Sequence, residues 1–396
     1  MRRMMLLVVA AVAVLAVPGS ARPSESVQAR WVVTGLGIGD AVAINEGGAI
    51  VGNGDPYSQR SHAFLWEKGS LRDLGALPDG IRSYAVAIND GGQVVGWSNF
   101  KNPHGNSAAH RGVLWQQGGM TDLGTLGGLG SRALAINGSG QIVGTSVTAS
   151  GQTHAFLWQE GAMIDLGTLG GKYSEAVAVN ERGQVVGSSD TTATDPDGDP
   201  IRHAFRWQDG KMTDLGVPPG FTSSEAVAIN GRGQVVGWTV IRVWDESWGD
   251  FSSVRHAFVW ENGKMRRLGG KWGSEAVAIN DNGQVIGSGT VKVGGYFAKH
   301  AFLWKNGQTR DLGTLGGSMT EAAAINKRGQ IIGWADTKAD KDHAFLWVNG
   351  KMRDLGTLPK NVQSKAVALN NSNQIIGQAT DQNFRVTGVL WTLRSG

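Results

Sequence analysis

Six histidines recur along the chain, each four residues before a tryptophan, and five of them are followed eleven residues later by an aspartate. Histidine beside a carboxylate is an arrangement that proteins use for acid–base catalysis and for metal binding. A functional site usually occurs once, whereas a scaffold repeats, so we expect these residues to be structural. The pairs are His62 with Asp73, His154 with Asp165, His203 with Asp214, His300 with Asp311, and His343 with Asp354.

The spacing of these pairs predicts a contact between neighbouring strands. Each aspartate lies seven residues after the tryptophan, and across a hairpin with a two-residue loop it would face the histidine directly. Arg111 and Asp122 keep a pair of opposite charges in one further copy, whereas His256 would face Arg267 in another. We interpret the pairs as polar links that hold strands together.

An acidic turn is a second candidate site. Asp195, Asp197 and Asp199 stand at alternate positions, and three carboxylates spaced in this way could wrap a hard cation such as calcium. The segment lacks the glycine at the sixth position and the glutamate at the twelfth that an EF-hand loop requires. A solvated acidic turn is the other interpretation of these residues.

Aromatic residues that do not repeat gather in one segment that also holds carboxylates. The segment contains Trp238, Trp244, Trp248 and Phe251. Exposed aromatic rings beside carboxylates suit sugar stacking, although the same rings could cover the fold as a local core. We expect this segment to make the main ligand contact, and we expect a neutral glycan to bind better than an anionic one.

Carboxylates also recur at one position of consecutive repeats, as Glu175, Glu225, Glu275 and Glu321. They would form an acidic arc beside the aromatic segment. The arc could be the solvated mouth of a channel, or it could bind a cation or a cationic ligand. Paired carboxylates can also cleave glycosides, but copies related by symmetry lack the two different environments that such a catalytic pair usually needs.

One repeat supplies the elements that must position these residues. A segment like Ala-Val-Ala-Ile-Asn occurs eight times, at intervals of 43 to 50 residues. A Gln-Val-Val-Gly-like run and a His-Ala-Phe-Leu-Trp-like run follow it, and a run such as that from Lys351 to Gly356 completes the unit. The asparagines number the units from one to eight and are Asn45, Asn89, Asn137, Asn180, Asn230, Asn280, Asn326 and Asn370.

The four runs of a unit, which we name A to D, are short, apolar or alternating, and bounded by glycine, as is typical of strands. The third residue after the asparagine is glycine in seven units and Asn373 in the eighth, and the third residue after the tryptophan is also glycine in units one to seven. These residues predict tight turns, so that each unit is two hairpins, A–B and C–D. We therefore predict an all-β fold, an eight-bladed β-propeller of four-stranded blades.

The eighth unit ends too early to contain a strand D. Only five residues follow Trp391, whereas the segment from Trp31 to Gly37 precedes the first unit and matches a strand D. We expect this N-terminal strand to complete the last C-terminal blade and to close the ring. The eight repeated tryptophans are expected to fill the core between the blades, since large aromatic side chains dominate burial.

The repeated tripeptide resembles that of the HAF family of extracellular repeats. It begins at His62, His154, His203, His256, His300 and His343. Two units depart from the pattern, at Arg111 and Thr387, although the middle residue of the tripeptide stays small. The resemblance covers nearly all of the chain after its N-terminal segment. It implies export and implies little about activity.

The N-terminal segment predicts export as well. Arg2 and Arg3 precede an apolar run and small residues at 19–21, so we expect residues 1–21 to be a signal peptide and residues 22–396 to be a single domain. No other apolar stretch approaches the length of a membrane span. The chain has no cysteine, so burial and hydrogen bonds must hold the fold. We expect a secreted monomer that is extracellular, or periplasmic where an outer membrane exists.

Composition and missing motifs narrow the function. The formal net charge is +4 over 396 residues and no basic run occurs, which argues against nucleic acid as a partner. The sequence lacks a nucleophile elbow, a zinc-protease motif and a phosphate-binding loop. We predict a non-enzymatic binding or scaffold module for an extracellular carbohydrate or protein, with calcium as its only candidate cofactor. The alternative is an extracellular hydrolase or lyase that acts on a glycan through the acidic arc.

Overall fold

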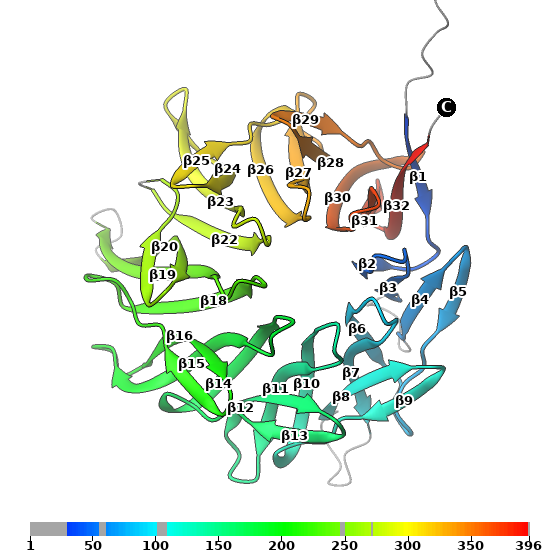
Figure 1. The fold of residues 1–396 in the computed structure, drawn as a ribbon. Coiled ribbons are helices and arrows are strands. Elements are labelled where there is room, and N and C mark those ends of the chain that lie inside the picture. The colour runs from blue at the N-terminus through cyan, green and yellow to red at the C-terminus, as the bar shows by residue number, and fades with distance from the viewer. Residues whose placement is uncertain (1–29, 55–60, 101–108, 246–249, 271, 395–396) are drawn as a thin grey trace, which may run out of the picture.

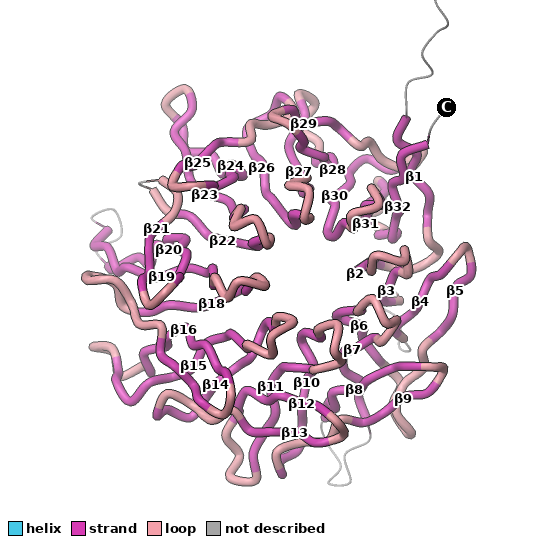
Figure 2. Tube along the Cα trace, in the orientation of Figure 1, coloured by secondary structure: helices cyan, strands magenta, loops and turns pink. Residues whose placement is uncertain are grey.

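The computed structural model describes residues 30–394 except for 55–60, 101–108, 246–249 and 271. In this part of the chain the regular elements are β-strands, which form a ring of blades around an axis (Figure 1). Figure 2 shows the same ring built from strands and loops. The prediction of an all-β propeller is confirmed. The described residues contain no helix that could span a membrane, and the expected signal peptide, residues 1–21, lies outside them.

Strands A lie nearest the axis of the ring and strands B follow them outward (Figure 1). Strands A are β2 (Asp40–Ile44), β6 (Ser83–Ile88), β10 (Gly127–Ile136), β14 (Gly170–Val179), β18 (Ser223–Ile229), β22 (Ser274–Ile279), β26 (Gly316–Ile325) and β30 (Asn361–Leu369). Strands B are β3 (Ile50–Asn53), β7 (Val94–Phe100), β11 (Ile142–Thr148), β15 (Val185–Thr194), β19 (Val235–Asp245), β23 (Val285–Val293), β27 (Ile331–Thr337) and β31 (Gln374–Asp381).

Strands C and D complete each blade on the outer side. Strands C are β4 (Ala63–Glu67), β8 (Ala109–Gln116), β12 (Thr153–Gln159), β16 (Pro200–Gln208), β20 (Asp250–Glu261), β24 (Tyr296–Lys305), β28 (Asp342–Val348) and β32 (Val386–Arg394). Strands D are β5 (Ser70–Asp73), β9 (Gly119–Asp122), β13 (Ala162–Asp165), β17 (Lys211–Asp214), β21 (Lys264–Arg267), β25 (Gln308–Asp311), β29 (Lys351–Asp354) and, for the last blade, β1 (Arg30–Gly35).

The first and last strands of the described chain close the ring. Within each of the eight blades the strands are antiparallel, and a single parallel bridge between Thr153 and Tyr173 joins the third blade to the fourth. In the last blade β1 pairs antiparallel with β32, from Arg30 opposite Arg394 through to Gly35. The prediction that an N-terminal strand completes this blade is confirmed.

The turns contain the residues that a left-handed backbone favours. Gly48 in the first A–B turn has a φ of 82°, and Asn373, which replaces glycine in the eighth unit, has a φ of 61°. In the first C–D turn Lys68 and Gly69 have φ values of 50° and 86°. Two successive positive values are typical of the type I′ hairpin turn, whose twist matches that of the strands. The predicted A–B and C–D hairpins are confirmed.

A bulge in every strand A explains the glycine that recurs in strand B. In blade five the register shifts between Ala226 and Ala228, and Gly237 lies opposite Ala226. A Cβ on Gly237 would clash with the carbonyl oxygen of Glu225. Strand B can therefore follow the bulge only with glycine at this position. The bulge also sets the position of the residue before the first alanine, which is the position of the acidic arc.

The hydrophobic core lies between neighbouring blades. In one cluster Val236 and Val259 of blade five pack with Val285 and Phe302 of blade six. The repeated tryptophans belong to such clusters, as predicted. Five of them are buried, namely Trp115, Trp260, Trp304, Trp347 and Trp391, while Trp66, Trp158 and Trp207 are half-buried and pack against the clusters.

A closed ring of hydrogen bonds surrounds the axis at the A–B turns. Nδ2 of Asn45 donates to the carbonyl oxygen of Asn89 at 3.1 Å, and the asparagine of each unit does the same to the next. The last of them, Asn370, donates to the carbonyl of Asn45 at 3.1 Å. Each Oδ1 accepts a backbone N–H of its own turn, as from Ala49 to Asn45 at 2.9 Å. These asparagines are buried, and their spacing in the sequence marks the repeat without showing that they form a ring of hydrogen bonds.

Candidate functional site

The B–C and D–A connections open on one face of the ring, which we call the connection face. The longer B–C connections extend this face, and in blade five β19 and β20 stay paired out to Asp245 and Asp250. The segment expected to be a ligand-binding loop is thus a long hairpin in which Trp244 lies opposite Phe251. Trp248 lies outside the described residues.

Carboxylates of the predicted acidic arc lie between blades, and cations of the preceding blade pair with two of them. Nη1 of Arg255 lies 2.9 Å from Oε1 of Glu275, and Nζ of Lys299 lies 2.8 Å from Oε1 of Glu321. The arc is therefore a row of opposite charges at these boundaries and not a bare acidic surface. Because these carboxylates are already paired with cations, they give no support to the expectation that a neutral glycan binds better than an anionic one.

Glu225 and Trp238 share a cleft of about 480 Å³ between blades four and five. The two residues are cross-strand neighbours, and the guanidinium of Arg255 lies over the Trp238 ring, 4.0 Å from its centroid. Burial raises the pKa of Glu225, although the charges of Arg202 and Arg255 oppose that effect. Because a guanidinium covers one face of Trp238, only the rest of this ring is open to a ligand.

The cleft between blades five and six has a volume of about 490 Å³ and combines both charges with hydroxyl groups. Glu275 and Lys299 line it together with Thr290 and Ser288. Trp272, which belongs to the D–A connection that enters blade six, also lines this cleft. This cleft therefore combines a cation, a carboxylate, hydroxyl groups and an aromatic ring.

An exposed aromatic cluster borders this cleft. Phe297, on the B–C hairpin of blade six, packs its ring against Trp272 at a centroid distance of 5.1 Å and an angle of 64°. Trp272 is 46% exposed, Phe297 is 60% exposed, and the neighbouring Tyr296 is 81% exposed. These three residues are not among those predicted from the sequence to form a site. The sequence feature that could have indicated them is that they are aromatic and do not repeat from unit to unit.

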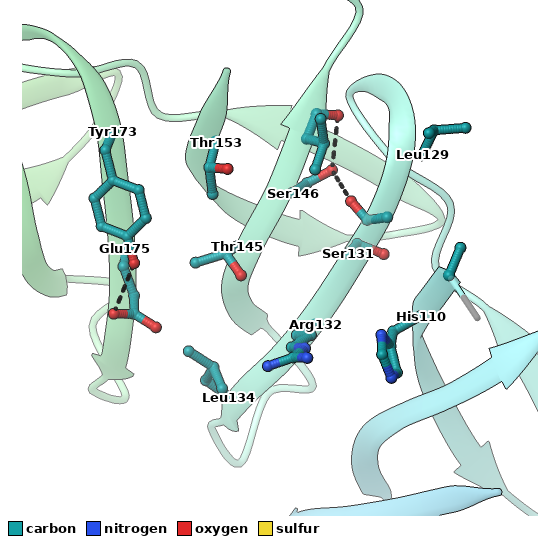
Figure 3. Close-up of a pocket in the computed structure, with 13 residues that line it drawn as sticks. His110, Leu129, Ser131, Arg132, Leu134, Thr145, Ser146, Thr153, Tyr173 and Glu175 are labelled. Atoms are coloured by element: carbon teal, nitrogen blue, oxygen red, sulfur yellow. Dashed lines mark hydrogen bonds between the residues drawn. The ribbon is translucent and has the colours of Figure 1, made fainter. Parts of the chain in front are cut away.

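A third cleft, of about 480 Å³, extends over blade three from blade two to blade four (Figure 3). Figure 3 shows His110 and Arg132 at one side of it and Tyr173 with Glu175 at the other. The Tyr173 hydroxyl donates to Oε2 of Glu175 at 3.2 Å. Burial, helped by the charge of Glu175, raises the pKa of Tyr173 to about 12. The structure thus places Glu175 in a different cleft from Glu225 and Glu275.

The predicted calcium turn is held by hydrogen bonds and by an arginine. Oδ1 of Asp195 accepts the backbone N–H groups of Asp197 and Asp199, at 2.9 Å and 3.0 Å. Nη1 of Arg242 lies 2.9 Å from Oδ2 of Asp197 and 3.6 Å from Oδ2 of Asp195. In the described part of the chain no three histidine or acidic side chains are placed to hold a metal ion. This geometry gives the calcium prediction no support.

The five histidine–aspartate pairs are in contact, but their predicted register is wrong. Nδ1 of His62 lies 3.0 Å from both carboxylate oxygens of Asp73, although Phe64 is the residue directly opposite that aspartate. The turn residues are Lys68 and Gly69, one position later than direct pairing requires, so the histidine reaches its partner diagonally. The other Nδ1 to carboxylate distances are 2.9 Å for His154–Asp165, 2.9 Å for His203–Asp214, 2.7 Å for His300–Asp311 and 2.8 Å for His343–Asp354.

The aspartates of these pairs also bind backbone. Oδ1 of Asp214 accepts the N–H of Gly216 at 2.7 Å. Burial tends to raise the pKa of Asp214, but the hydrogen bonds from His203 and Gly216 outweigh burial and lower it. Carboxylates engaged in this way on two sides are already satisfied, which supports a structural role and leaves little capacity for a ligand.

Comparison with known proteins supports the fold. A family model described as "Protein of unknown function (DUF3466)" matches residues 261–355. The search of curated proteins found no match. Among solved structures, the β-propeller domain of the Trilobed protease from Pyrococcus furiosus has a TM-score of 0.50 and 10% identity, and the match covers 78% of this chain and 93% of that domain.

A second similar structure is dipeptidyl peptidase 4 of Porphyromonas gingivalis, with a TM-score of 0.55 and 8% identity. That match covers 90% of this chain and 58% of the peptidase. The Pyrococcus domain is described as having an open velcro topology, whereas β1 closes the ring of the present chain through β32. At such low identity these likenesses show the fold alone: the chain is a β-propeller similar to the propeller domain of the Pyrococcus protease.

Proposed function

We propose that this chain is an exported, non-enzymatic propeller that binds an extracellular glycan on its connection face. The observation that carries the proposal is the exposed pair of Trp272 and Phe297 at the cleft between blades five and six. An exposed aromatic surface of this kind on a soluble protein marks an interaction site more often than it marks packing.

The cleft supplies the polar contacts that a sugar needs beside such a surface. A sugar ring stacks its C–H groups on an aromatic face, while its hydroxyls require both donors and acceptors. Lys299 offers donors, Glu275 offers acceptors, and Thr290 offers either. Because the charged groups are paired within the protein, a glycan does not have to compensate an isolated charge when it binds.

Export is supported by the N-terminal segment and by the tripeptide. The segment of residues 1–21 has the composition of a signal peptide. The HAF-like tripeptides resemble those of extracellular repeats. A chain without cysteine can also fold in an oxidising compartment with no risk of wrong disulfides.

The alternative, glycan cleavage, has one supporting observation. Glu225 has a raised pKa, and a carboxyl group that stays protonated could serve as a general acid. Against this, Glu275 and Glu321 already form ion pairs within the protein. Incubating the bound polymer with the protein and measuring new reducing ends decides the point. Cleavage that disappears in Glu225→Gln would establish the alternative.

A glycan array with the purified mature protein tests the proposal. The wild-type chain should bind a restricted set of glycans, and Trp272→Ala combined with Phe297→Ala should lose that binding without a lower melting temperature, because both rings are exposed. Phe384→Ala is the matched control, since Phe384 is 85% exposed on the B–C turn of blade eight. Absence of any bound glycan, or a protein ligand in place of a glycan, would overturn the proposal, and unchanged binding by the double variant would overturn its assignment to Trp272 and Phe297.

A second double variant tests the segment that sequence analysis favoured. If Trp244→Ala with Trp248→Ala loses binding while the Trp272 and Phe297 variant retains it, the ligand contact lies on the hairpin of blade five. The site assigned here would then be wrong, although glycan binding itself would stand.

A further inference from the structure

Opposite charges face each other across four consecutive blade boundaries of the connection face. One residue comes from strand C of a blade and the other from strand A of the next. At one boundary the signs are reversed, with Nζ of Lys365 2.9 Å from Oδ2 of Asp342. The facing residues are Arg202 and Glu225, Arg255 and Glu275, Lys299 and Glu321, and Asp342 and Lys365.

The boundary between blades two and three breaks this rule. His110 holds the strand C position and Arg132 holds the strand A position, so two basic residues face each other. Within the described part of the chain no carboxylate forms an ion pair with Arg132. Burial, followed by the charge of Arg132, lowers the pKa of His110. Arg132 thus adds a positive charge to this boundary and has no ion-pair partner among the described residues.

Stacked aromatic rings hold these two basic residues in place. The ring of Trp97 lies 4.4 Å from that of His110 at an angle of 85°, and the guanidinium of Arg132 lies 5.3 Å from the Trp97 centroid. The Tyr84 ring stacks on Trp97, with the ring centroids 4.3 Å apart. Packing against an aromatic ring restrains the arginine before any ligand arrives, which reduces the entropy lost on binding.

Neutral and acceptor groups line the rest of this cleft. Thr145, the cross-strand neighbour of Arg132, and Thr153 line its middle, and on its far side Glu175 accepts the hydroxyl of Tyr173 (Figure 3). One oxygen of Glu175 is taken by Tyr173, so the other can accept from a ligand hydroxyl. A volume of about 480 Å³ has room for a sugar residue.

We propose that this cleft is a second ligand site, which binds a hexuronate, a sugar ring with one carboxylate. Arg132 and His110 receive the carboxylate, and Thr145, Thr153 and Glu175 meet the ring hydroxyls. A phosphate monoester fits less well, because Glu175 in the same cleft repels its greater negative charge more strongly. The site lies in a different cleft from Trp272 and does not depend on the glycan proposed to bind there.

Titration calorimetry with free glucuronate and galacturonate tests this site. Glucose and galactose measure the ring without the carboxylate, acetate measures the carboxylate without the ring, and glycine probes an amino acid as ligand. We expect the uronates to bind more tightly than any of these. Arg132→Gln should weaken uronate binding about tenfold or more, since it removes a charge-assisted contact.

Arg310→Gln is the matched control. Arg310 lies 5.3 Å from the centroid of Trp347, the same distance as Arg132 from that of Trp97, but it lines none of the clefts described above. This variant should keep the wild-type affinity for uronates. Uronate binding should also raise the pKa of His110, which an NMR titration assigned with His110→Gln would follow.

The proposal is overturned if uronates do not bind at millimolar concentration, if glucose or glycine binds as tightly, or if Arg132→Gln keeps full affinity. The double variant at Trp272 and Phe297 separates the two sites. It should retain uronate binding in calorimetry while it loses array binding. Arg132→Gln should lose uronate binding in calorimetry while it retains binding to the neutral glycans of the array.

Discussion

Arg255 lies between two partners from different elements: its guanidinium covers the Trp238 ring at 4.0 Å while Nη1 contacts Glu275 of the next blade at 2.9 Å. One side chain thus connects strand B of blade five to strand A of blade six. The repeat brings these residues together because strands A and C run in the same direction and meet at each blade boundary.

The pair of Arg255 and Glu275 should contribute little to stability. Its side chains are 50% and 37% exposed, and ion pairs at such sites are worth about 0.2–1 kcal/mol. A double-mutant cycle with Arg255→Gln and Glu275→Gln, followed by chemical denaturation, should give a coupling energy below about 1 kcal/mol. A coupling energy of several kcal/mol would contradict this prediction and show that the ion pair contributes substantially to the stability of the blade boundary.

Removal of residues 22–37 should open the ring. This deletion takes away β1, so that β32 becomes an exposed edge that can pair with another chain. We expect a lower melting temperature in calorimetry and self-association in sedimentation. Removal of residues 22–29 alone leaves β1 in place and serves as the control. A shorter chain that stays monomeric and melts as high as the control would contradict a closing role for β1.

Loss of one histidine–aspartate contact should lower stability but not ligand binding. His154→Ala removes the hydrogen bond to Asp165 and should lower the free energy of unfolding by about 1 kcal/mol. Arg111→Ala, whose contact to Asp122 is longer at 3.6 Å, should cost less. If His154→Ala abolished glycan binding at unchanged stability, the histidines would be functional residues.

Stability should fall in mild acid because of His256. Burial, and then the charge of Arg267, lowers the pKa of His256 below its ordinary value of 6.5. The unfolded chain therefore binds a proton more readily than the folded chain between the two pKa values. The free energy of unfolding should decrease as the pH falls below about 6.5, with a slope of up to about 1.4 kcal/mol per pH unit for this one group.

His256→Gln is the variant that isolates this effect. Its unfolding free energy, measured by denaturation at a series of pH values, should depend less on pH than that of the wild-type chain. His110, whose pKa is also lowered, contributes with the same sign in both proteins. An unchanged pH dependence in His256→Gln would show that the titration of His256 is not coupled to folding.

The fold could be predicted because its signals are local and repeat. Glycine at Gly48 or Gly69 marks a turn through its own backbone conformation, and the segment after Trp31 matches a strand that the last unit lacks. The contact of His62 with Asp73 was predicted, but its register was not, because the turn position depends on Lys68 adopting a left-handed conformation that its residue type does not favour.

The candidate sites were harder to predict, because they combine residues of different blades. The cation that pairs with Glu275 lies twenty residues earlier, in a strand of another blade. Trp272 and Phe297 come from two different connections, and neither connection contains a sequence motif that indicates a binding site. Neither composition nor spacing shows which side chains meet across a blade boundary, since that depends on the angle between neighbouring sheets.

The ring of asparagine hydrogen bonds has a consequence for how the propeller comes apart. A linear array of repeats frays from its two ends, where a terminal repeat has one neighbour only. Here Asn370 bonds to Asn45, so each A–B turn has a neighbour on both sides and no unit is terminal. Opening any one turn breaks two of the eight bonds at once. The amide protons of the A–B turns should therefore exchange with solvent through opening of the whole ring. Their exchange rates should be similar in all eight units and should not form a gradient from the chain ends.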